Sequence, residues 1–419
     1  MTDDLESRFA DLIARRTDFP ALARLHEGRT LAHFDGPGGT QVPQTVIDAV
    51  SGCYRTANAN THGFFVTTVE TDRMLHDARA AMADFLGADN ARDISFGANM
   101  TTLAWGLAHA FARRFQPGDE VLVSNLDHEA NRGPWLMLRE HGMVVREIAI
   151  RPDATLDYDD FAAQVTPRTR LVAVGMASNA FGTVNDIARA RELAYRAGAW
   201  LLVDAVHYAP HFPLDVRSLG VDFLLCSAYK FYGPHVGVLY SRNGLLDGLA
   251  TDRLRTQDPR APHRIETGTL NHAAIAGTLA AVDYLASLGA GASRRERVIA
   301  ALNRVAEYER ELAQRIWRGL QRLPAVTLVG PPFGTGRRAP TVSFTVAGLE
   351  AAEVCRRLAE RGICAWDGHF YAIRPIELLG LLERGATSRG AAGSPTRRRL
   401  SRGMGRPIST SGHTGTHST

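Results

Sequence analysis

Short apolar runs alternate with helical segments between about residue 70 and residue 240 of this 419-residue chain. The runs read as buried strands and lie at 121–123, 171–174, 201–203 and 223–225. Between two of them, residues 186–198 begin with a capping aspartate and close on a glycine, as a helix does. This alternation predicts an α/β fold with a mostly parallel sheet. In such sheets, ligands bind at the carboxyl ends of the strands.

Further patterns lie on either side of this region. Residues 4–16 predict an amphipathic helix that ends before Pro20, and residues 294–322 predict a long helix with apolar residues at steps of three and four. A strand at 341–346 and a helix at 351–361 then begin a smaller second domain. We therefore expect a large α/β domain together with a small one that both ends of the chain build.

The pattern stops at Leu381. From there to residue 419 the chain has no aromatic residue and no apolar period, and it is rich in Gly, Ser, Thr and Arg, which predicts a disordered tail. The tail holds seven arginines and one acidic residue, so its net charge is +6. The whole chain has a net charge of +4, so the residues before the tail carry about −2. The basic balance is therefore no evidence for a nucleic-acid-binding body, and such a function would rest on residues 397–399 alone.

The predicted division has four parts. Residues 1–33 form an N-terminal helical segment that joins the small domain, and residues 34–290 form the large domain. Residues 291–380 form the small domain, which is incomplete at its C-terminal end. Residues 381–419 form the basic tail.

The composition excludes several classes of protein. The acidic start lacks the basic-then-apolar order of a signal peptide, and no stretch approaches the roughly eighteen uncharged apolar residues of a membrane span. The four cysteines are scattered without paired spacing, so we expect neither a metal site nor a disulfide framework. A cytoplasmic protein without membrane or nucleic-acid partners is the prediction.

Lys230 is the only lysine in the chain. Arginine stays protonated and cannot form a Schiff base, whereas a lysine amine with a lowered pKa can. The competing interpretation is that Lys230 remains by chance in a composition that favours arginine. One residue alone does not decide between these two interpretations.

Polar residues follow the predicted strands at the points where the strands end. Each of them alone could have a structural role, such as capping a helix, but together they form a set at one edge of the sheet. They are His128, Asn179, Asp204, His207, Ser227 and Lys230.

Pyridoxal phosphate fits this set, because it needs a lysine amine, a carboxylate against its pyridine nitrogen and a phosphate cup. Asp204 can supply the carboxylate, and His128 a flat face for stacking. Residues 97–102, directly before a helical stretch at 103–115, have the form of a phosphate-binding helix start. A glycine-rich stretch at 34–40 is either a loop at the edge of the site or a plain surface turn.

In these stretches the chain resembles the class V aminotransferase family of pyridoxal phosphate enzymes, and within it the cysteine desulfurases. The resemblance runs in the family's order from about residue 34 to about residue 375. The matching stretches are 96–102, 127–131, 178–183, 204–207, 227–230 and 266–271.

The resemblance implies a role for each matched residue. Lys230 would form the Schiff base and move the Cα proton of the substrate, and His128 would stack on the cofactor ring. Asp204 would pair with the ring nitrogen, and Asn179 and His207 would bond the ring hydroxyl.

The resemblance also implies how the phosphate is held. Met100, Thr101 and Ser227 would bind it, together with Tyr229, where relatives often have histidine. Thr269 would reach the phosphate of a neighbouring subunit, which implies a homodimer with shared sites.

The chain departs from the family at the loop that carries the nucleophilic cysteine of persulfide-forming desulfurases. Tyr371 stands where that cysteine would be, and Cys364 lies seven residues earlier. Because free cysteine is among the most buried residue types, we expect Cys364 to pack inside, which makes a persulfide relay doubtful.

The second departure is the missing arginine strand that grips the substrate carboxylate in relatives. Arg374 either substitutes for it or is a surface residue. Our hypothesis is that the tail is out of register with the family, for example through a reading-frame change, and an undisturbed frame at the locus would count against it.

The function that follows is a pyridoxal-phosphate-dependent enzyme that acts on a small amino acid by Cα-proton abstraction, with elimination or C–S cleavage. The same apparatus serves epimerases and aminotransferases. A catalytically inactive cofactor-binding protein is the alternative outside enzymes.

Overall fold

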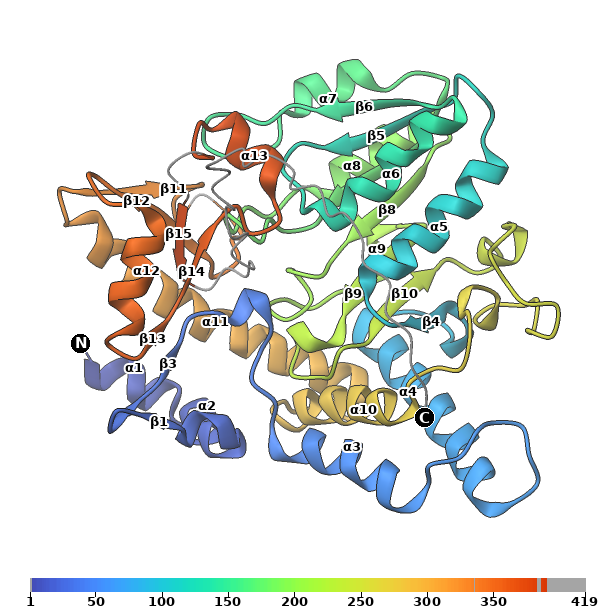
Figure 1. Ribbon diagram of the computed structural model, residues 1–419, viewed down its shortest axis with the longest axis horizontal. Helices are drawn as coiled ribbons and strands as arrows, with labels where there is room; N and C mark the ends of the chain where they lie inside the picture. The colour runs from blue at the N-terminus through green and yellow to red at the C-terminus, as the bar shows by residue number, and fades with distance from the viewer. Residues whose placement is uncertain (1, 335, 383–385, 390–419) are drawn as a thin grey trace, which may run out of the picture.

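The computed structural model describes residues 2–334, 336–382 and 386–389. Its centre is a seven-stranded sheet in the order β4-β10-β9-β8-β7-β5-β6 (Figure 1). All neighbours are parallel except β10, which runs antiparallel to both β4 and β9. The strands are β4 (Ile94–Gly97), β5 (Glu120–Ser124), β6 (Val144–Ile148), β7 (Thr169–Gly175), β8 (Trp200–Asp204), β9 (Phe223–Ser227) and β10 (Gly237–Ser241).

The four predicted strands are confirmed as β5, β7, β8 and β9, which occupy the middle of the sheet. Every residue of β5 and β9 is buried, which explains why each reads as a continuous apolar run. The sequence analysis missed β4 and β6, the two edge strands, and β10. In β6, a partly exposed Arg146 and Glu147 interrupt the apolar pattern.

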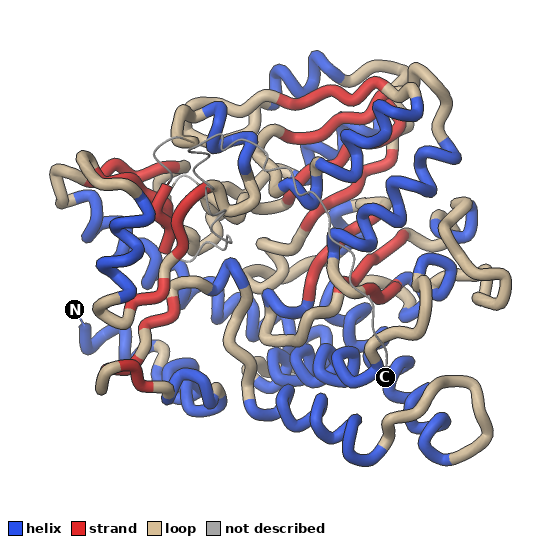
Figure 2. The backbone as a smooth tube through the Cα atoms, viewed as in Figure 1, coloured by secondary structure: helices blue, strands red, loops and turns tan. Residues whose placement is uncertain are grey.

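Helices cover both faces of this sheet (Figure 2). One face packs against α5 (Met100–Arg114), through Leu107 and Phe111. The other packs against α4 (Val66–Leu86), α8 (Ile187–Arg196) and α10 (His272–Ser287), through residues such as Leu193 and Val282. The predicted helix at 186–198 is α8, with Asp186 as its N-cap and Gly198 in the left-handed region at a φ of +67°.

The remaining α-helices of the large body are α3 (Gln44–Thr56), α6 (Gly133–Leu136), α7 (Tyr158–Gln164) and α9 (Val216–Leu219). Short 3-10 helices lie at η1 (Arg15–Asp18), η2 (Pro20–Ala23), η3 (Gly36–Gly38), η4 (Ala91–Asp93), η5 (Glu129–Asn131), η6 (Met137–His141), η7 (Ala228–Lys230), η8 (Leu246–Gly248) and η9 (His263–Ile265).

The predicted long helix is confirmed as α11 (Arg294–Gln321), which begins at a capping box between Ser293 and Glu296. It leads to a second sheet, which is antiparallel in the order β11-β12-β15-β14. These elements are β11 (Val326–Val329), β12 (Val342–Val346), β14 (Trp366–Gly368), β15 (Ala386–Arg389), α12 (Ala351–Ala359) and α13 (Ile373–Leu378).

The N-terminal residues lie beside this second sheet (Figure 1). A short hairpin of β1 (Leu25–His26) and β2 (Arg29–Thr30) precedes β3 (Ala32–His33). Strand β3 pairs in parallel with β13 (Ile363–Cys364). The boundaries at 33/34 and 290/291 stay predictions.

One predicted helix is wrong in its continuity. Residues 4–16 form two helices, α1 (Thr2–Arg8) and α2 (Ala10–Ala14), because Phe9 leaves the helical region at a φ of −121°. Phe9 is fully buried, and its ring centroid lies 5.0 Å from that of Tyr308 on α11. Tertiary packing has overridden the local helical pattern here.

The predicted disordered tail is wrong for Ala386–Arg389, which form β15 between β12 and β14. The small sheet therefore has a strand that we expected it to lack. Residues 390–419, with the arginines at 397–399, lie outside the described residues. In the part of the chain that is described, no helix combines the length and apolar character needed to cross a membrane.

Candidate active site

A cavity of about 630 Å³ opens at the carboxyl ends of β5, β7, β8 and β9. It brings together all but one of the predicted site residues, from segments more than a hundred residues apart. Those that line it are Met100, Thr101, His128, Asn179, Asp204, His207, Ser227, Tyr229 and Lys230. Asp127, Trp105 and Trp366 also line it, and we had assigned them no role.

Lys230 ends η7, directly after β9. Its Nζ atom donates a hydrogen bond to the Pro37 carbonyl oxygen and lies 5.0 Å from the ring centroid of Tyr229. Burial lowers the pKa of Lys230 to about 8, while the Asp204 carboxylate acts in the opposite direction. An amine with this pKa is partly neutral near pH 7, as a nucleophile or base must be.

The glycine-rich stretch at 34–40 is the loop that receives Lys230. Besides the Pro37 contact, Thr40 donates its N–H to the Tyr229 carbonyl oxygen at 3.0 Å, and its Oγ1 atom accepts from the Tyr232 N–H at 2.9 Å. Gly38 lines the cavity. Of the two interpretations left open, the loop at the edge of the site is therefore confirmed.

Asp204 ends β8 and points into the cavity. Its Oδ1 atom accepts a hydrogen bond from the Val206 N–H at 2.9 Å. Burial raises the pKa of Asp204 to about 6, against the effects of that N–H and of Lys230. Above this pH the side chain is a carboxylate, which can keep a pyridine nitrogen protonated.

Asp127 is a second buried carboxylate in the cavity wall. Its Oδ2 atom accepts hydrogen bonds from the Gly175 N–H at 2.8 Å and from Asn131 Nδ2 at 2.9 Å. Burial and then the charge of Asp204 raise its pKa to about 7. The sequence did carry a signal, because Asp127 precedes His128 in one of the family-like stretches.

His128 presents a flat, neutral ring. Its Nδ1 atom accepts a hydrogen bond from the Ala130 N–H at 3.0 Å, so the ring proton sits on Nε2. Burial, followed by the charges of Lys230 and His369, lowers its pKa to about 4. The ring centroid lies 5.5 Å from that of Tyr371. A neutral imidazole in a cavity wall suits stacking on an aromatic ligand.

Asn179 and His207 have protein partners in addition to their place in the cavity. Asn179 Nδ2 donates to the Phe370 carbonyl oxygen at 2.7 Å, and His207 Nε2 lies 2.7 Å from Thr341 Oγ1. Burial lowers the pKa of His207 well below its usual value. The Oδ1 atom of Asn179 is buried and has no hydrogen-bond partner among the described residues.

Helix α5 begins at the cavity, at the position where the sequence predicts a phosphate cup. Asn99 caps it by accepting the Thr102 N–H at 2.9 Å, and Ser227 Oγ accepts the Met100 N–H at 3.1 Å. Thr101 follows in the first turn and lines the cavity. Free N–H groups and the helix dipole make such a start a favourable site for a phosphate.

Thr269 is the one predicted site residue that does not line this cavity. It is exposed and lines a separate hollow of about 630 Å³ with His235 and Asn271. A contact with the phosphate of a neighbouring subunit stays a prediction.

The loop after β14 places Tyr371 at the cavity with 44% of its surface exposed. Phe370 and Tyr371 both have positive φ, +53° and +57°, a conformation that is strained for residues other than glycine. Cys364, expected to pack inside, is only half-buried, which corrects that prediction. It lies beside His33 and Asp35, outside the cavity lining.

Arg374 is not placed to bind a substrate carboxylate in the cavity. It lies near Glu147 at 3.5 Å and Glu377 at 3.4 Å, and it is absent from the cavity lining. The surface interpretation of Arg374 therefore holds. Among the described residues, Lys230 is the one basic Lys/Arg side chain that lines the cavity.

These residues fit pyridoxal phosphate. The cavity combines the Lys230 amine, the Asp204 carboxylate, the His128 ring and the helix start at Met100. The deciding observation is Asn179 Oδ1, because a buried acceptor without a partner is costly, and a hydroxyl group on a bound ligand would satisfy it. The volume lies within the usual range for small-molecule sites.

The family model described as Aminotransferase class-V matches residues 32–382. The chain belongs to the class V aminotransferase family. The prediction made from the six motif stretches is thereby confirmed. The match ends next to residue 381, where we expected the chain to stop resembling the family.

Relatives of this member of the class V aminotransferase family are named cysteine desulfurases. The chain is 35% identical to the cysteine desulfurase of Klebsiella pneumoniae (strain 342), over 85% of this chain and 88% of the relative. It is 31% identical to a probable cysteine desulfurase of Synechocystis, over 87% of each chain.

Solved structures show the same fold. The apo cysteine desulfurase of Thermococcus onnurineus matches with a TM-score of 0.81 at 26% identity, over 90% of this chain and 92% of that one. An S-sulfonic acid form of a cysteine desulfurase from Escherichia coli matches with a TM-score of 0.78 at 28% identity, over 91% and 93%. The predicted α/β pyridoxal-phosphate enzyme fold is confirmed, and the chain is a pyridoxal-phosphate-dependent enzyme.

Proposed function

We propose that this enzyme is a C–S lyase that acts on L-cysteine or a closely similar small amino acid. One observation carries the proposal: the single lysine of the chain lies with a lowered pKa in a cavity that it shares with Asp204 and His128. The names of the relatives support the substrate class, and the chain matches most of their length.

Pyridoxal phosphate, when bound, supplies an electron-accepting ring that stabilises negative charge at the substrate Cα atom. Lys230 would hold the cofactor covalently, and its freed amine would take the Cα proton. Asp204, ionised above about pH 6, would keep the pyridine nitrogen protonated. His128 would cover the flat face of the ring.

The other cavity residues orient the cofactor. Met100 and Thr101, at the start of α5, would bind the phosphate with Ser227 and Tyr229. Asn179 Oδ1 and the His207 ring would bond the ring hydroxyl, which gives the buried amide oxygen its missing partner. Thr269 of a second subunit would complete the phosphate site.

The residues at the cavity favour elimination over a persulfide relay. Tyr371 occupies the loop position where a nucleophilic cysteine would stand, and no described cysteine lines the cavity. In elimination the Cα proton leaves, the Cβ–S bond breaks and the thiolate departs. Hydrolysis then completes the balance: L-cysteine and water give pyruvate, ammonia and hydrogen sulfide.

A homodimer is part of the proposal. Phe64 is fully exposed, and Phe65 and Val66 are 61% and 68% exposed, which makes an apolar patch of the kind found at protein interfaces. The neighbouring Asn60 lines one hollow with Thr269. This supports an arrangement in which Thr269 faces a partner subunit.

A cytoplasmic location also stays part of the proposal. All four cysteines are free, as is usual for proteins in a reducing compartment.

Borohydride reduction of the full-length protein with pyridoxal phosphate tests the cofactor site. Because the chain has one lysine, peptide mass spectrometry should find the reduced cofactor on Lys230. It should be absent from that peptide in Lys230→Ala. A wild-type protein whose Lys230 carries no reduced cofactor would overturn the proposal.

Product analysis with L-cysteine tests the reaction. We expect pyruvate and sulfide in equal amounts, and alanine only in Tyr371→Cys supplied with a thiol. Alanine as the main product of the wild type would favour a desulfurase, and a labelled but inert protein would favour a cofactor-binding protein without activity. Racemisation of L-alanine would favour an epimerase. Conversion of L-alanine to pyruvate with transfer of its amino group would favour an aminotransferase.

A further inference from the structure

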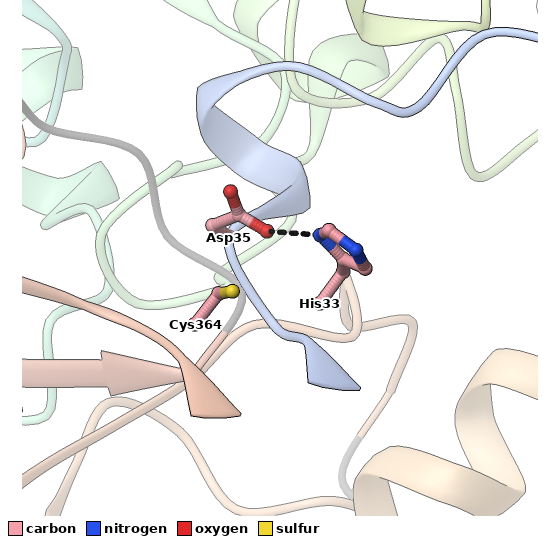
Figure 3. A group of neighbouring side chains, drawn as sticks. All are labelled: His33, Asp35 and Cys364. Atoms are coloured by element: carbon pink, nitrogen blue, oxygen red, sulfur yellow. Dashed lines mark ion pairs between the residues drawn. The ribbon is translucent and has the colours of Figure 1, made fainter. Parts of the chain in front are cut away.

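A group of three metal-ligating side chains lies outside the active-site cavity (Figure 3). His33 on β3 and Cys364 on β13 are directly opposite each other in the parallel pair of strands. Asp35 follows β3 and precedes η3. One ligand atom from each residue lies within 4.8 Å of the other two.

The spacing within the group is unusual for hydrogen bonding. His33 Nδ1 and Asp35 Oδ1 are 3.6 Å apart, longer than the roughly 2.7–3.2 Å of an N–H···O hydrogen bond. Two ligand atoms about 2.0–2.2 Å from one tetrahedral metal ion would lie about 3.3–3.6 Å apart. The pair therefore has nearly the separation of two ligands that share an ion.

Two atoms of this group lack hydrogen-bond partners: the Asp35 oxygen of that pair, and the ring nitrogen of His33 outside the pair. Asp35 Oδ1 and His33 Nε2 are buried, and neither makes a hydrogen bond to the described residues. The other ring nitrogen of His33 lies 3.4 Å from Gln41 Nε2, a long contact. A buried carboxylate oxygen without a donor calls for a water molecule or a cation.

We propose that His33, Asp35 and Cys364 form a binding site for a divalent cation of the zinc class. Imidazole nitrogen, thiolate sulfur and carboxylate oxygen are the three kinds of ligand that Zn²⁺ takes, and a water molecule would fill the fourth position. Binding converts the Cys364 thiol into a metal-bound thiolate and releases its proton to solvent.

The ion has a path to this site and a structural consequence. Asp35 lines a hollow of about 300 Å³, through which an ion can enter. The loop that follows Asp35 contains Pro37, whose carbonyl oxygen accepts the Lys230 hydrogen bond. A bound ion would tie β3 to β13 and so fix this loop beside the active site.

Protection of Cys364 from alkylation tests the site. The full-length, untagged holoenzyme is freed of metal by a chelator and alkylated with iodoacetamide, with and without added Zn²⁺. We expect Zn²⁺ to slow alkylation of Cys364 at least tenfold and to leave Cys53 unchanged, since Cys53 is also a half-buried free cysteine but does not belong to this metal-ligating group. Equal rates at Cys364 with and without Zn²⁺ would overturn the proposal.

Metal stoichiometry gives an independent readout. We expect one Zn²⁺ per chain, and with Co²⁺ the visible d–d bands of a tetrahedral site, both lost in Cys364→Ser and His33→Ala. They should persist in Cys53→Ser and in a His413→Asn, His417→Asn double variant, which removes two histidines near the C-terminus. Retention of the ion in Cys364→Ser would contradict the assignment. Retention in Lys230→Ala is expected, because the site does not depend on the cofactor.

Discussion

The carboxylates of Asp127 and Asp204 line one cavity, and the negative charge of Asp204 raises the pKa of Asp127. Burial is the larger cause for both groups, with pKa values of about 7 and about 6. Among the described residues that line this cavity, Lys230 is the one lysine or arginine. A bound ring with a protonated nitrogen would therefore stabilise the ionised forms of these carboxylates.

The contribution of Asp127 to the stability of the cofactor-free protein should fall as the pH rises from about 4 to about 7. The folded-state pKa of Asp127 lies above its unfolded value, so its contribution to stability is present below the unfolded pKa and is lost as the pH rises through about 7. Asp127→Asn should therefore be more stable than the wild type at pH 8, by on the order of 1–3 kcal/mol, and not at pH 4. Thermal unfolding at the two pH values measures this.

Asp159→Asn is the matched control, since the Asp159 side chain is 84% exposed, and it should change neither value appreciably. If Asp127→Asn differs from the wild type equally at both pH values, the raised pKa is contradicted.

Replacing His128 should separate its flat shape from its ability to carry charge. The lowered pKa of about 4 keeps this ring neutral from pH 5 upward, so stacking needs no charge. We expect His128→Phe to bind pyridoxal phosphate within about threefold of the wild type, and His128→Ala to bind about tenfold more weakly. Both variants lose the Ala130 N–H contact, so a cofactor titration that gives them equal affinities would argue against stacking.

Arg338 should matter for stability although it is not in the active site. It is 7% exposed, and its guanidinium donates to the carbonyl oxygens of Pro331, Thr341 and Phe181 at 2.7, 2.6 and 2.9 Å. Arg338→Met leaves these buried acceptors without donors, which should lower the free energy of unfolding by about 3 kcal/mol or more. Arg337→Met, at the exposed neighbouring position, should cost less than about 1 kcal/mol, and chemical denaturation compares them. Equal losses would contradict this role.

Gly237 should be required for the phosphate cup. A Cβ atom at this position of β10 would lie 2.2 Å from the carbonyl carbon of Asn99, the cap of α5. Gly237→Ala must therefore displace the helix start, and we expect a loss of about 1–3 kcal/mol in stability and at least tenfold weaker cofactor binding. Gly248→Ala meets no atom within 4 Å and serves as the control. Unchanged cofactor affinity in Gly237→Ala would show that the helix start is not the phosphate site.

The sequence alone determined the central strands and most of the candidate site. Strands β5, β7, β8 and β9 are buried on both faces, so each must be a continuous apolar run, and a run of this kind is visible without a structure. Polar residues after such runs meet at one edge, because parallel strands end on the same side. For that reason His128, Asp204 and Lys230 could be grouped before their positions were known.

Only the tertiary structure decided the features that depend on contacts between distant segments. Phe9 breaks a helical pattern because it packs against Tyr308, and Ala386–Arg389 become a strand because β12 and β14 pair with them. Cys364 lies more than three hundred residues from His33 in the sequence, yet the pairing of β3 with β13 places the two side by side. Local patterns record the burial and backbone preferences of a segment, whereas these contacts depend on which surface the fold brings against it.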